Sequence, residues 1–194
     1  MRSATVQRKT KETNISVTLE IDGSGKYSVS TGVGFLDHML ELFTKHGMFN
    51  LQLKCKGDLH VDDHHTTEDV AIALGKAFDK ALKERAGISR YGSAYVPMDE
   101  SLARCVVDLG GRSALVFKAD FNRKKVGDLS TEMIRHFFQS FAENVKANVH
   151  VEVLYGVNTH HKIEALFKAL ARAMRIACEK DARVKGVLST KGNL

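Results

Sequence analysis

The chain has 194 residues and a formal net charge of +6, with 43% hydrophobic and 27% charged residues; this is the composition of an ordinary globular protein long enough to bury a sizeable core. No apolar run reaches the roughly 18 residues of a membrane span, the first residues lack an apolar signal core, and the three cysteines are widely spaced, so we expect a cytoplasmic protein with no membrane partner. The basic charge favours an anionic partner. Because the basic residues are dispersed along the chain, we expect a small phosphorylated substrate and no nucleic acid.

In the first half, apolar and polar residues alternate at period two before the pattern changes to that of an amphipathic helix. Ile15, Val17 and Leu19 show the alternation most clearly. The pattern predicts strands at 3–9, 14–21 and 26–30, a helix at 34–47, a strand at 51–55 and a helix at 64–86.

The second half repeats this order. It predicts strands at 92–97, 101–109 and 113–119, a longer loop at 122–128, a helix at 130–145, a strand at 149–153 and a helix at 160–180. The simplest account is a duplicated βββαβα unit of about 95 residues, which is too small to close a core alone. We therefore predict an α+β fold and a single domain, 1–194, whose two repeats span about 3–87 and 92–183.

The pattern His-His-x-x-Glu occurs twice, from His64 to Glu68 and from His160 to Glu164, each time at the start of a predicted helix. On a helix the first histidine and the glutamate stand four residues apart and share one face. Adjacent histidines point about 100° apart, so one small metal ion cannot easily bind both of them. The two copies therefore predict two metal ions rather than one.

One further histidine in each half completes the set. His38 corresponds to His136 when the repeats are aligned, and Glu12 falls near Glu100. Taken singly, His38 and His136 would be hydrogen-bonded interior histidines, because both have apolar neighbours; their matched positions favour metal ligands instead. Imidazole and carboxylate ligands favour zinc, manganese or iron over calcium, and the absence of paired cysteines argues against a sulfur-rich zinc site.

Four segments resemble the signatures of the imidazoleglycerol-phosphate dehydratase family, namely 34–39 (GFLDHM), 64–69 (HHTTED), 158–165 (NTHHKIEA) and 189–192 (STKG). The resemblance extends from Arg8 to Gly192. It implies a ribosomal protein S5 domain 2-like fold, in which helices pack between two four-stranded sheets. It also implies dehydration of imidazole glycerol phosphate to imidazole acetol phosphate in histidine biosynthesis, with two Mn²⁺ per active site and self-association of trimers into a 24-mer.

The resemblance further implies a role for individual residues. Glu12 corresponds to a glutamate that contacts the substrate, and we expect it to be the base that removes a carbon-bound proton, with orientation of the substrate hydroxyls as the alternative. One metal ion is expected at His38, His65, His160 and Glu164. The other is expected at His64, Glu68, His136 and His161. In the family, the ligands that complete each ion's shell come from neighbouring subunits. The substrate and its phosphate are expected at His46, Arg90, Arg112, Lys168, Ser189, Thr190 and Lys191.

Two other classes of function use similar residues. A di-metal phosphoesterase would release inorganic phosphate, but such sites depend on Asp and on bridging carboxylates, whereas this set is mostly imidazole. A non-enzymatic metal-storage or nucleic-acid-binding module would show no turnover and would bind DNA or RNA in a salt-dependent way. Without the resemblance, each basic residue of the substrate set would be interpreted as a solvated surface charge. The sequence does not identify the metal used in the cell.

Overall fold

The computed structural model describes residues 2–192. The first half forms β1 (Ser3–Lys9), β2 (Thr13–Glu20), β3 (Tyr27–Ser30), α1 (Gly34–Gly47), β4 (Asn50–Gly57) and α2 (His64–Leu82). The second half forms β5 (Tyr91–Met98), β6 (Ser101–Asp108), β7 (Ala114–Lys118), β8 (Lys125–Val126), β9 (Leu129–Ser130), α3 (Glu132–Val145), β10 (Asn148–Tyr155) and α4 (Thr159–Cys178). Apart from the β8–β9 hairpin, the two halves contain the same elements in the same order.

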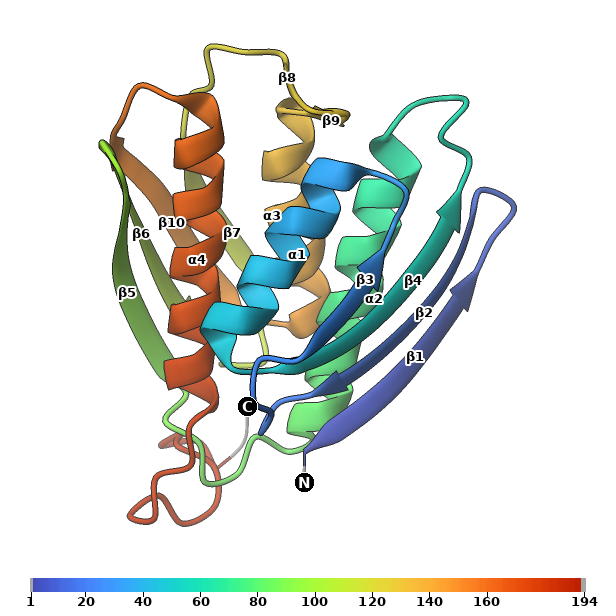
Figure 1. Ribbon diagram of the computed structural model, residues 1–194. Helices are drawn as coiled ribbons and strands as arrows, with labels where there is room; N and C mark the ends of the chain where they lie inside the picture. The colour runs from blue at the N-terminus through green and yellow to red at the C-terminus, as the bar shows by residue number, and fades with distance from the viewer. Residues whose placement is uncertain (1, 193–194) are drawn as a thin grey trace.

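Two four-stranded sheets enclose the four helices (Figure 1). The strand orders are β1-β2-β4-β3 and β5-β6-β10-β7. Neighbouring strands run antiparallel except for one parallel pair in each sheet, β3 with β4 and β7 with β10. Helices α1 and α2 cover the first sheet and α3 and α4 the second, while α2 packs against α3 and α1 against α4. The predicted α+β fold, with helices between two sheets, is confirmed.

Strand β2 shows why each sheet is covered on one face only. Ile15, Val17 and Leu19 point toward the helices and are at most 1% exposed, whereas the intervening Ser16 and Thr18 face outward. At the centre, Gly75 lets α2 and α3 approach closely, because an added Cβ would lie 2.8 Å from the carbonyl oxygen of Phe141. The core is consequently one continuous layer shared by both halves.

Helix α2 ends at Leu82 and not at residue 86, as the sequence pattern predicts. Lys83 and Arg85 adopt φ values of 52° and 57°, and the Arg85 side chain turns back into the protein. Its guanidinium donates hydrogen bonds to the carboxylate of Asp79 and to three carbonyl oxygens, those of Leu109, Val145 and Lys146. The helix ends early because these tertiary hydrogen bonds require Arg85 to leave the helical path.

The predicted loop at 122–128 contains part of the short β8–β9 hairpin. Asp63, immediately before α2, accepts hydrogen bonds from the backbone N–H and the hydroxyl of Ser130. This contact between the halves holds the hairpin against the start of α2, so α3 begins at Glu132 and not at residue 130.

Replacing Arg85 by Met should lower the free energy of unfolding by about 3–5 kcal/mol, because Asp79 and three carbonyl oxygens, in two buried hydrogen bonds and one partly buried one, would lose a charged donor. The matched control is Lys146→Met, since Lys146 pairs with the same Asp79 but its side chain is 56% exposed; that change should cost less than about 1 kcal/mol. Urea unfolding at a fixed protein concentration measures both values. Equal losses in the two variants would show that the buried hydrogen bonds of Arg85 contribute nothing beyond its ion pair.

All four helices begin at the same end of the molecule, the upper end in Figure 1, and the β1–β2 and β5–β6 turns lie at that end as well. The segment that leads into β5 and the tail that follows α4 lie at the lower end. None of the helices in the described part of the chain has the length and apolar character that a membrane crossing requires.

Candidate active site

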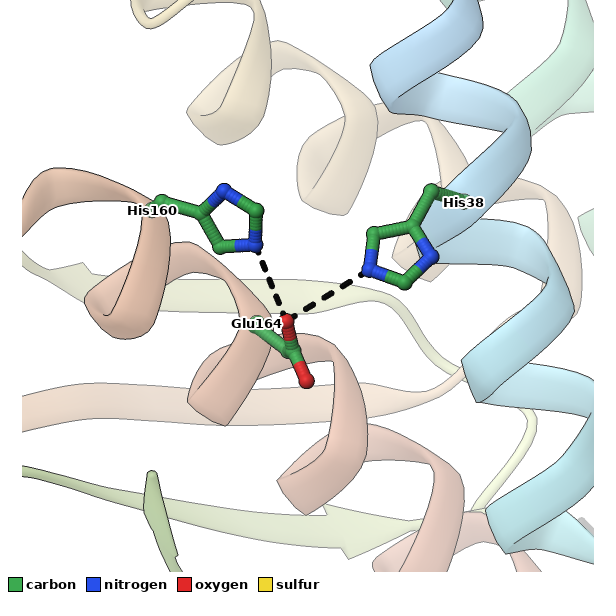
Figure 2. A group of neighbouring side chains, drawn as sticks. All are labelled: His38, His160 and Glu164. Atoms are coloured by element: carbon green, nitrogen blue, oxygen red, sulfur yellow. Dashed lines mark hydrogen bonds and ion pairs between the residues drawn. The ribbon is translucent and has the colours of Figure 1, made fainter. Parts of the chain in front are cut away.

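Three predicted ligands converge between α1 and α4, and Figure 2 shows them. His38 Nε2 lies 3.5 Å from Oε2 of Glu164, and His160 Nε2 lies 3.1 Å from the same oxygen. Glu164 is only 6% exposed, whereas the imidazoles of His38 and His160 are 49% and 39% exposed. These residues, the first cluster, form a buried carboxylate flanked by two accessible rings.

Three further ligands form the second cluster, with His64 and Glu68 on α2 and His136 on α3. The Nε2 atoms of His64 and His136 lie 3.7 Å and 3.4 Å from the two oxygens of Glu68. Within residues 2–192, Nε2 of His136 is buried and has no hydrogen-bond partner. Leaving a buried polar atom unpaired costs about 1–3 kcal/mol. A metal ion bound in the cluster would give this nitrogen the partner that it lacks.

Both clusters fit a divalent metal ion. In each, the ligand atoms of two imidazoles and one carboxylate lie within 4.8 Å of one another, and zinc, manganese and iron bind to these ligand types. The first cluster takes His38 from the first half and its other two members from the second half; the second cluster takes only His136 from the second half. The duplication thus produces two equivalent sites, each requiring both halves.

Local hydrogen bonds fix the helix starts that carry the ligands. The side chain of Asn158 caps α4 by accepting from the backbone N–H groups of His160 and His161, at 2.9 Å and 3.4 Å, which is a standard helix N-cap. On α1, Asp37 accepts from the backbone N–H and the hydroxyl of Thr31. Hydrogen bonds with the residues just before α1 and α4 therefore hold the helix turns that carry the histidines.

The other two predicted metal ligands, His65 and His161, do not join either cluster. His65 forms a hydrogen bond through Nδ1 with Asp58, at 3.0 Å, and His161 forms one through Nδ1 with Glu100, at 2.7 Å. Each hydrogen bond raises the pKa of its histidine above the ordinary value. The pKa of Glu100 is lowered in turn, by the backbone N–H of Asn158 and then by His161. Each four-ligand set is thus three-quarters assembled within one chain.

Glu12 lies in the β1–β2 turn, and its side chain is 51% exposed. Its Oε1 is 3.7 Å from Nε2 of His65, which is too far for a hydrogen bond. The turn itself is anchored, because buried Asp69 on α2 accepts from the hydroxyl of Thr13 and pairs with Arg8. The structure therefore places a free carboxylate beside a predicted metal ligand, on a turn that is tied to the ligand-bearing helix.

Lys168 contacts the first cluster rather than the other phosphate-binding candidates. Its ammonium lies 2.6 Å from Oε1 of Glu164. Burial alone would raise the pKa of Glu164, but the hydrogen bond and charge of Lys168, followed by the hydrogen bond with His160, lower it. His46, near the end of α1, has a lowered pKa because of burial and the positive charges of Lys168 and Arg172.

The remaining predicted substrate residues line one cavity of about 1070 Å³. These are Arg90, Arg112, Ser189, Thr190 and Lys191. Arg90 forms a two-pronged ion pair with Asp108, at 2.7 Å and 3.0 Å, and donates to the carbonyl oxygen of Leu188 in the C-terminal tail. Arg183 and Lys185 also line the cavity. It is a basic cavity made by the tail, the start of β5 with the residue before it, and the β6–β7 turn, at the end of the molecule opposite the helix starts (Figure 1).

Sequence reasoning did not select the acidic partners Asp58, Asp99 and Glu100. Alignment of the repeats places Glu12 near Glu100. In the structure, however, Asp99 is the residue equivalent to Glu12, because its Oδ2 lies 3.6 Å from Nε2 of His161, as Oε1 of Glu12 lies 3.7 Å from Nε2 of His65. The signal that could have identified these acids is their location, since Asp58 directly follows β4 and the other two form the β5–β6 turn.

Comparison with known proteins places this chain among the dehydratases. The family model described as imidazoleglycerol-phosphate dehydratase matches residues 31–174. The imidazoleglycerol-phosphate dehydratase of Salinibacter ruber is 58% identical over 193 residues, covering 100% of this chain and 96% of its own; that of Bacillus pumilus is 57% identical over 194 residues, with 100% of both covered. The chain belongs to the imidazoleglycerol-phosphate dehydratase family.

Solved structures agree with this assignment. The crystal structure of imidazoleglycerol-phosphate dehydratase from Staphylococcus aureus is 40% identical, with a TM-score of 0.84, and covers 92% of this chain and 99% of that chain. The enzyme from Pyrococcus furiosus is 32% identical, with a TM-score of 0.83, and covers 97% and 100% of the two chains. The similarity therefore extends over nearly the whole of both proteins.

Proposed function

We propose that the two clusters, Glu12 and the basic cavity together carry out the reaction of the family. The chain is a hydro-lyase that dehydrates imidazole glycerol phosphate to imidazole acetol phosphate in histidine biosynthesis. The observation that supports the residue roles is the convergence of two imidazoles and one carboxylate in each cluster. We also propose that this enzyme acts in the cytoplasm.

The first cluster with His65, and the second cluster with His161, would each hold one Mn²⁺, giving two ions per active site. Ions bound there would supply Lewis-acid polarisation of the substrate imidazole, which would ease loss of the hydroxyl from the adjoining carbon. The chain's own contribution is to supply neutral imidazole lone pairs and one carboxylate charge at each ion. Lys168 holds the far oxygen of Glu164 and thereby keeps Oε2 turned toward His38 and His160.

Glu12 is the proposed base. Its exposed carboxylate makes no hydrogen bond to another side chain within residues 2–192, so it is free to accept a proton from the substrate carbon next to the departing hydroxyl. Loss of that proton and of the hydroxyl gives an enol, which tautomerises to the ketone. The nearby anchoring of the turn by Asp69 keeps Glu12 in place.

The predicted substrate residues of the cavity, Arg90, Arg112, Ser189, Thr190 and Lys191, would bind the phosphate. Arginine and lysine donate charge-assisted hydrogen bonds to phosphate oxygens, and arginine can do so with two parallel N–H groups. Arg112 makes no ion pair within the described residues, and Arg90 is oriented by Asp108 while some of its donors stay free. Ser189 and Thr190 add hydroxyl donors from the tail.

One chain does not complete this site. The cavity and the clusters lie at opposite ends of the molecule (Figure 1), and His65 and His161 are not members of either cluster but form hydrogen bonds with Asp58 and Glu100. We therefore propose that neighbouring chains supply the missing ligands and the phosphate-binding residues, in trimers that associate into a 24-mer.

The direct test is to incubate the purified chain with Mn²⁺ and imidazole glycerol phosphate and to follow formation of the ketone product. We expect turnover that depends on the metal. Release of inorganic phosphate without ketone would support a phosphoesterase instead, and absence of any turnover in metal-loaded protein would contradict the proposal.

Replacing Lys191 by Ala should raise KM roughly 10- to 150-fold, because one charge-assisted hydrogen bond to phosphate would be lost, while metal content stays unchanged. Arg183→Ala is the matched control, since Arg183 lines the same cavity but its guanidinium already pairs with Asp181 at 2.7 Å. Steady-state kinetics give both values. If the KM of the Lys191 variant equals that of the control, Lys191 is a solvated surface charge and does not bind the phosphate.

A further inference from the structure

The two predicted ligands outside the clusters share one geometry. His65 and His161 each form a hydrogen bond through Nδ1 with a carboxylate, that of Asp58 in one case and that of Glu100 in the other. In both, Nε2 faces away from that partner, and its nearest carboxylate oxygen stands beyond hydrogen-bond distance, at 3.7 Å and 3.6 Å. Both rings are partly exposed, at 33% and 25%.

Duplication alone does not produce this likeness, because the two carboxylates come from different places in the repeat. Asp58 directly follows β4, whereas Glu100 lies in the β5–β6 turn. The residue that directly follows β10, the counterpart of β4, is Gly156. An added Cβ at Gly156 would lie 2.2 Å from the hydroxyl oxygen of Ser101, so the second half has no room for an aspartate there. The same hydrogen bond is thus made twice by different means.

We propose that Asp58 and Glu100 are positioning residues that prepare His65 and His161 to bind a metal ion held by the cluster of a neighbouring chain. The inference rests on the proposed function. A histidine whose Nδ1–H donates to a carboxylate keeps its lone pair on Nε2, and the hydrogen bond fixes the direction in which that nitrogen points. The free Nε2 atoms are then turned outward, where a second chain can supply the other three ligands.

The two carboxylates differ in what else they do. Oε1 of Glu100 accepts from the backbone N–H groups of Val157 and Asn158, at 3.0 Å and 2.7 Å, so this residue also holds the start of α4. Oδ1 of Asp58 is buried without a hydrogen-bond partner in the described part of the chain. The side chain of Asp58 forms a hydrogen bond only with His65 there. A change at Asp58 therefore disturbs fewer other contacts than a change at Glu100.

The test measures the affinity of the full chain for Mn²⁺ alone, by competition with a chelating dye, together with the Mn²⁺ concentration at which the particle assembles. Asp58→Ala should lower the affinity of one of the two metal equivalents by about 10- to 100-fold and leave the other unchanged. Asp58→Asn should recover part of the loss, because the amide oxygen can still accept from Nδ1–H. Glu84→Ala is the control for charge, since Glu84 is exposed and makes no ion pair or side-chain hydrogen bond within residues 2–192; its two affinities should equal those of the unmodified chain.

Glu100→Gln provides the same test at the other site and serves if Asp58→Ala fails to fold. The amide oxygen of Gln can still accept from the backbone N–H groups of Val157 and Asn158, just before α4. The charge opposite His161 is lost, so the affinity of the other metal equivalent should fall. Wild-type affinity at both equivalents in either folded variant would overturn the inference, even if the unmodified chain binds two ions and turns over substrate. An unmodified chain that binds no Mn²⁺ would overturn the proposed metal sites along with it.

Discussion

Replacing Glu12 by Gln should lower kcat by about 10²–10⁴ while metal content, particle size and secondary structure stay unchanged. Gln keeps the shape of the side chain and much of its hydrogen bonding but cannot accept a proton from carbon. The structure supports this expectation, because the carboxylate is 51% exposed and no positive group of residues 2–192 lies within hydrogen-bond distance of it. If Glu12 were only an exposed acid on a turn, it would contribute less than about 1 kcal/mol to stability and nothing to catalysis.

Steady-state kinetics with a ketone assay measure the effect, and Glu84→Gln is a control at an exposed glutamate. A split between the kinetic constants distinguishes the two roles open to Glu12. Loss of kcat with little change in KM identifies the base, whereas a raised KM with kcat preserved identifies a residue that orients the substrate hydroxyls. A Glu12→Gln variant whose kcat stays within a few-fold of wild type removes Glu12 from the mechanism.

Removal of the metal should abolish activity and reduce the particle to trimers, and Mn²⁺ should restore both. The physical reason is that each four-ligand set is incomplete within one chain, so the ions would join chains as well as assist the chemistry. Metal affinity should fall as the pH drops toward and below about 6.5, because protonated imidazole has no lone pair to give.

Sedimentation in the presence and absence of a chelator, with metal analysis of each species, measures this prediction. We expect two ions per chain in the large particle. A particle of the same size with and without metal would contradict the coupling between metal and assembly, and one ion or none per chain in active protein would contradict the paired sites.

Much of this fold is encoded in short stretches of sequence. The alternation at Ile15, Val17 and Leu19 specifies a strand with one buried face, and the helix predicted at 34–47 is the helix observed. The repeated His-His-x-x-Glu pattern also lies at a helix start in both halves, and its i and i+4 members meet as the helical period requires, His64 with Glu68 and His160 with Glu164. These features depend on neighbours within one or two turns, so periodicity alone predicts them.

Other features depend on contacts between distant segments. The end of α2 is decided by Arg85, whose hydrogen bonds reach carbonyl groups more than 20 positions away in the chain. The correspondence of His38 with His136 indicated related positions, but only the packing of α1 on α4 and of α2 on α3 determines which carboxylate each imidazole meets.

The same limit applies to the second histidine of each pair. The sequence placed His65 and His161 among the ligands, yet their direction is set by Asp58 and Glu100, which no repeat pattern relates to each other. The clusters and the basic cavity also lie at opposite ends of the molecule, which the sequence motifs do not reveal. Sequence periodicity determines which face of an element a side chain occupies; what lies opposite that face is decided by how the two sheets close over the helices.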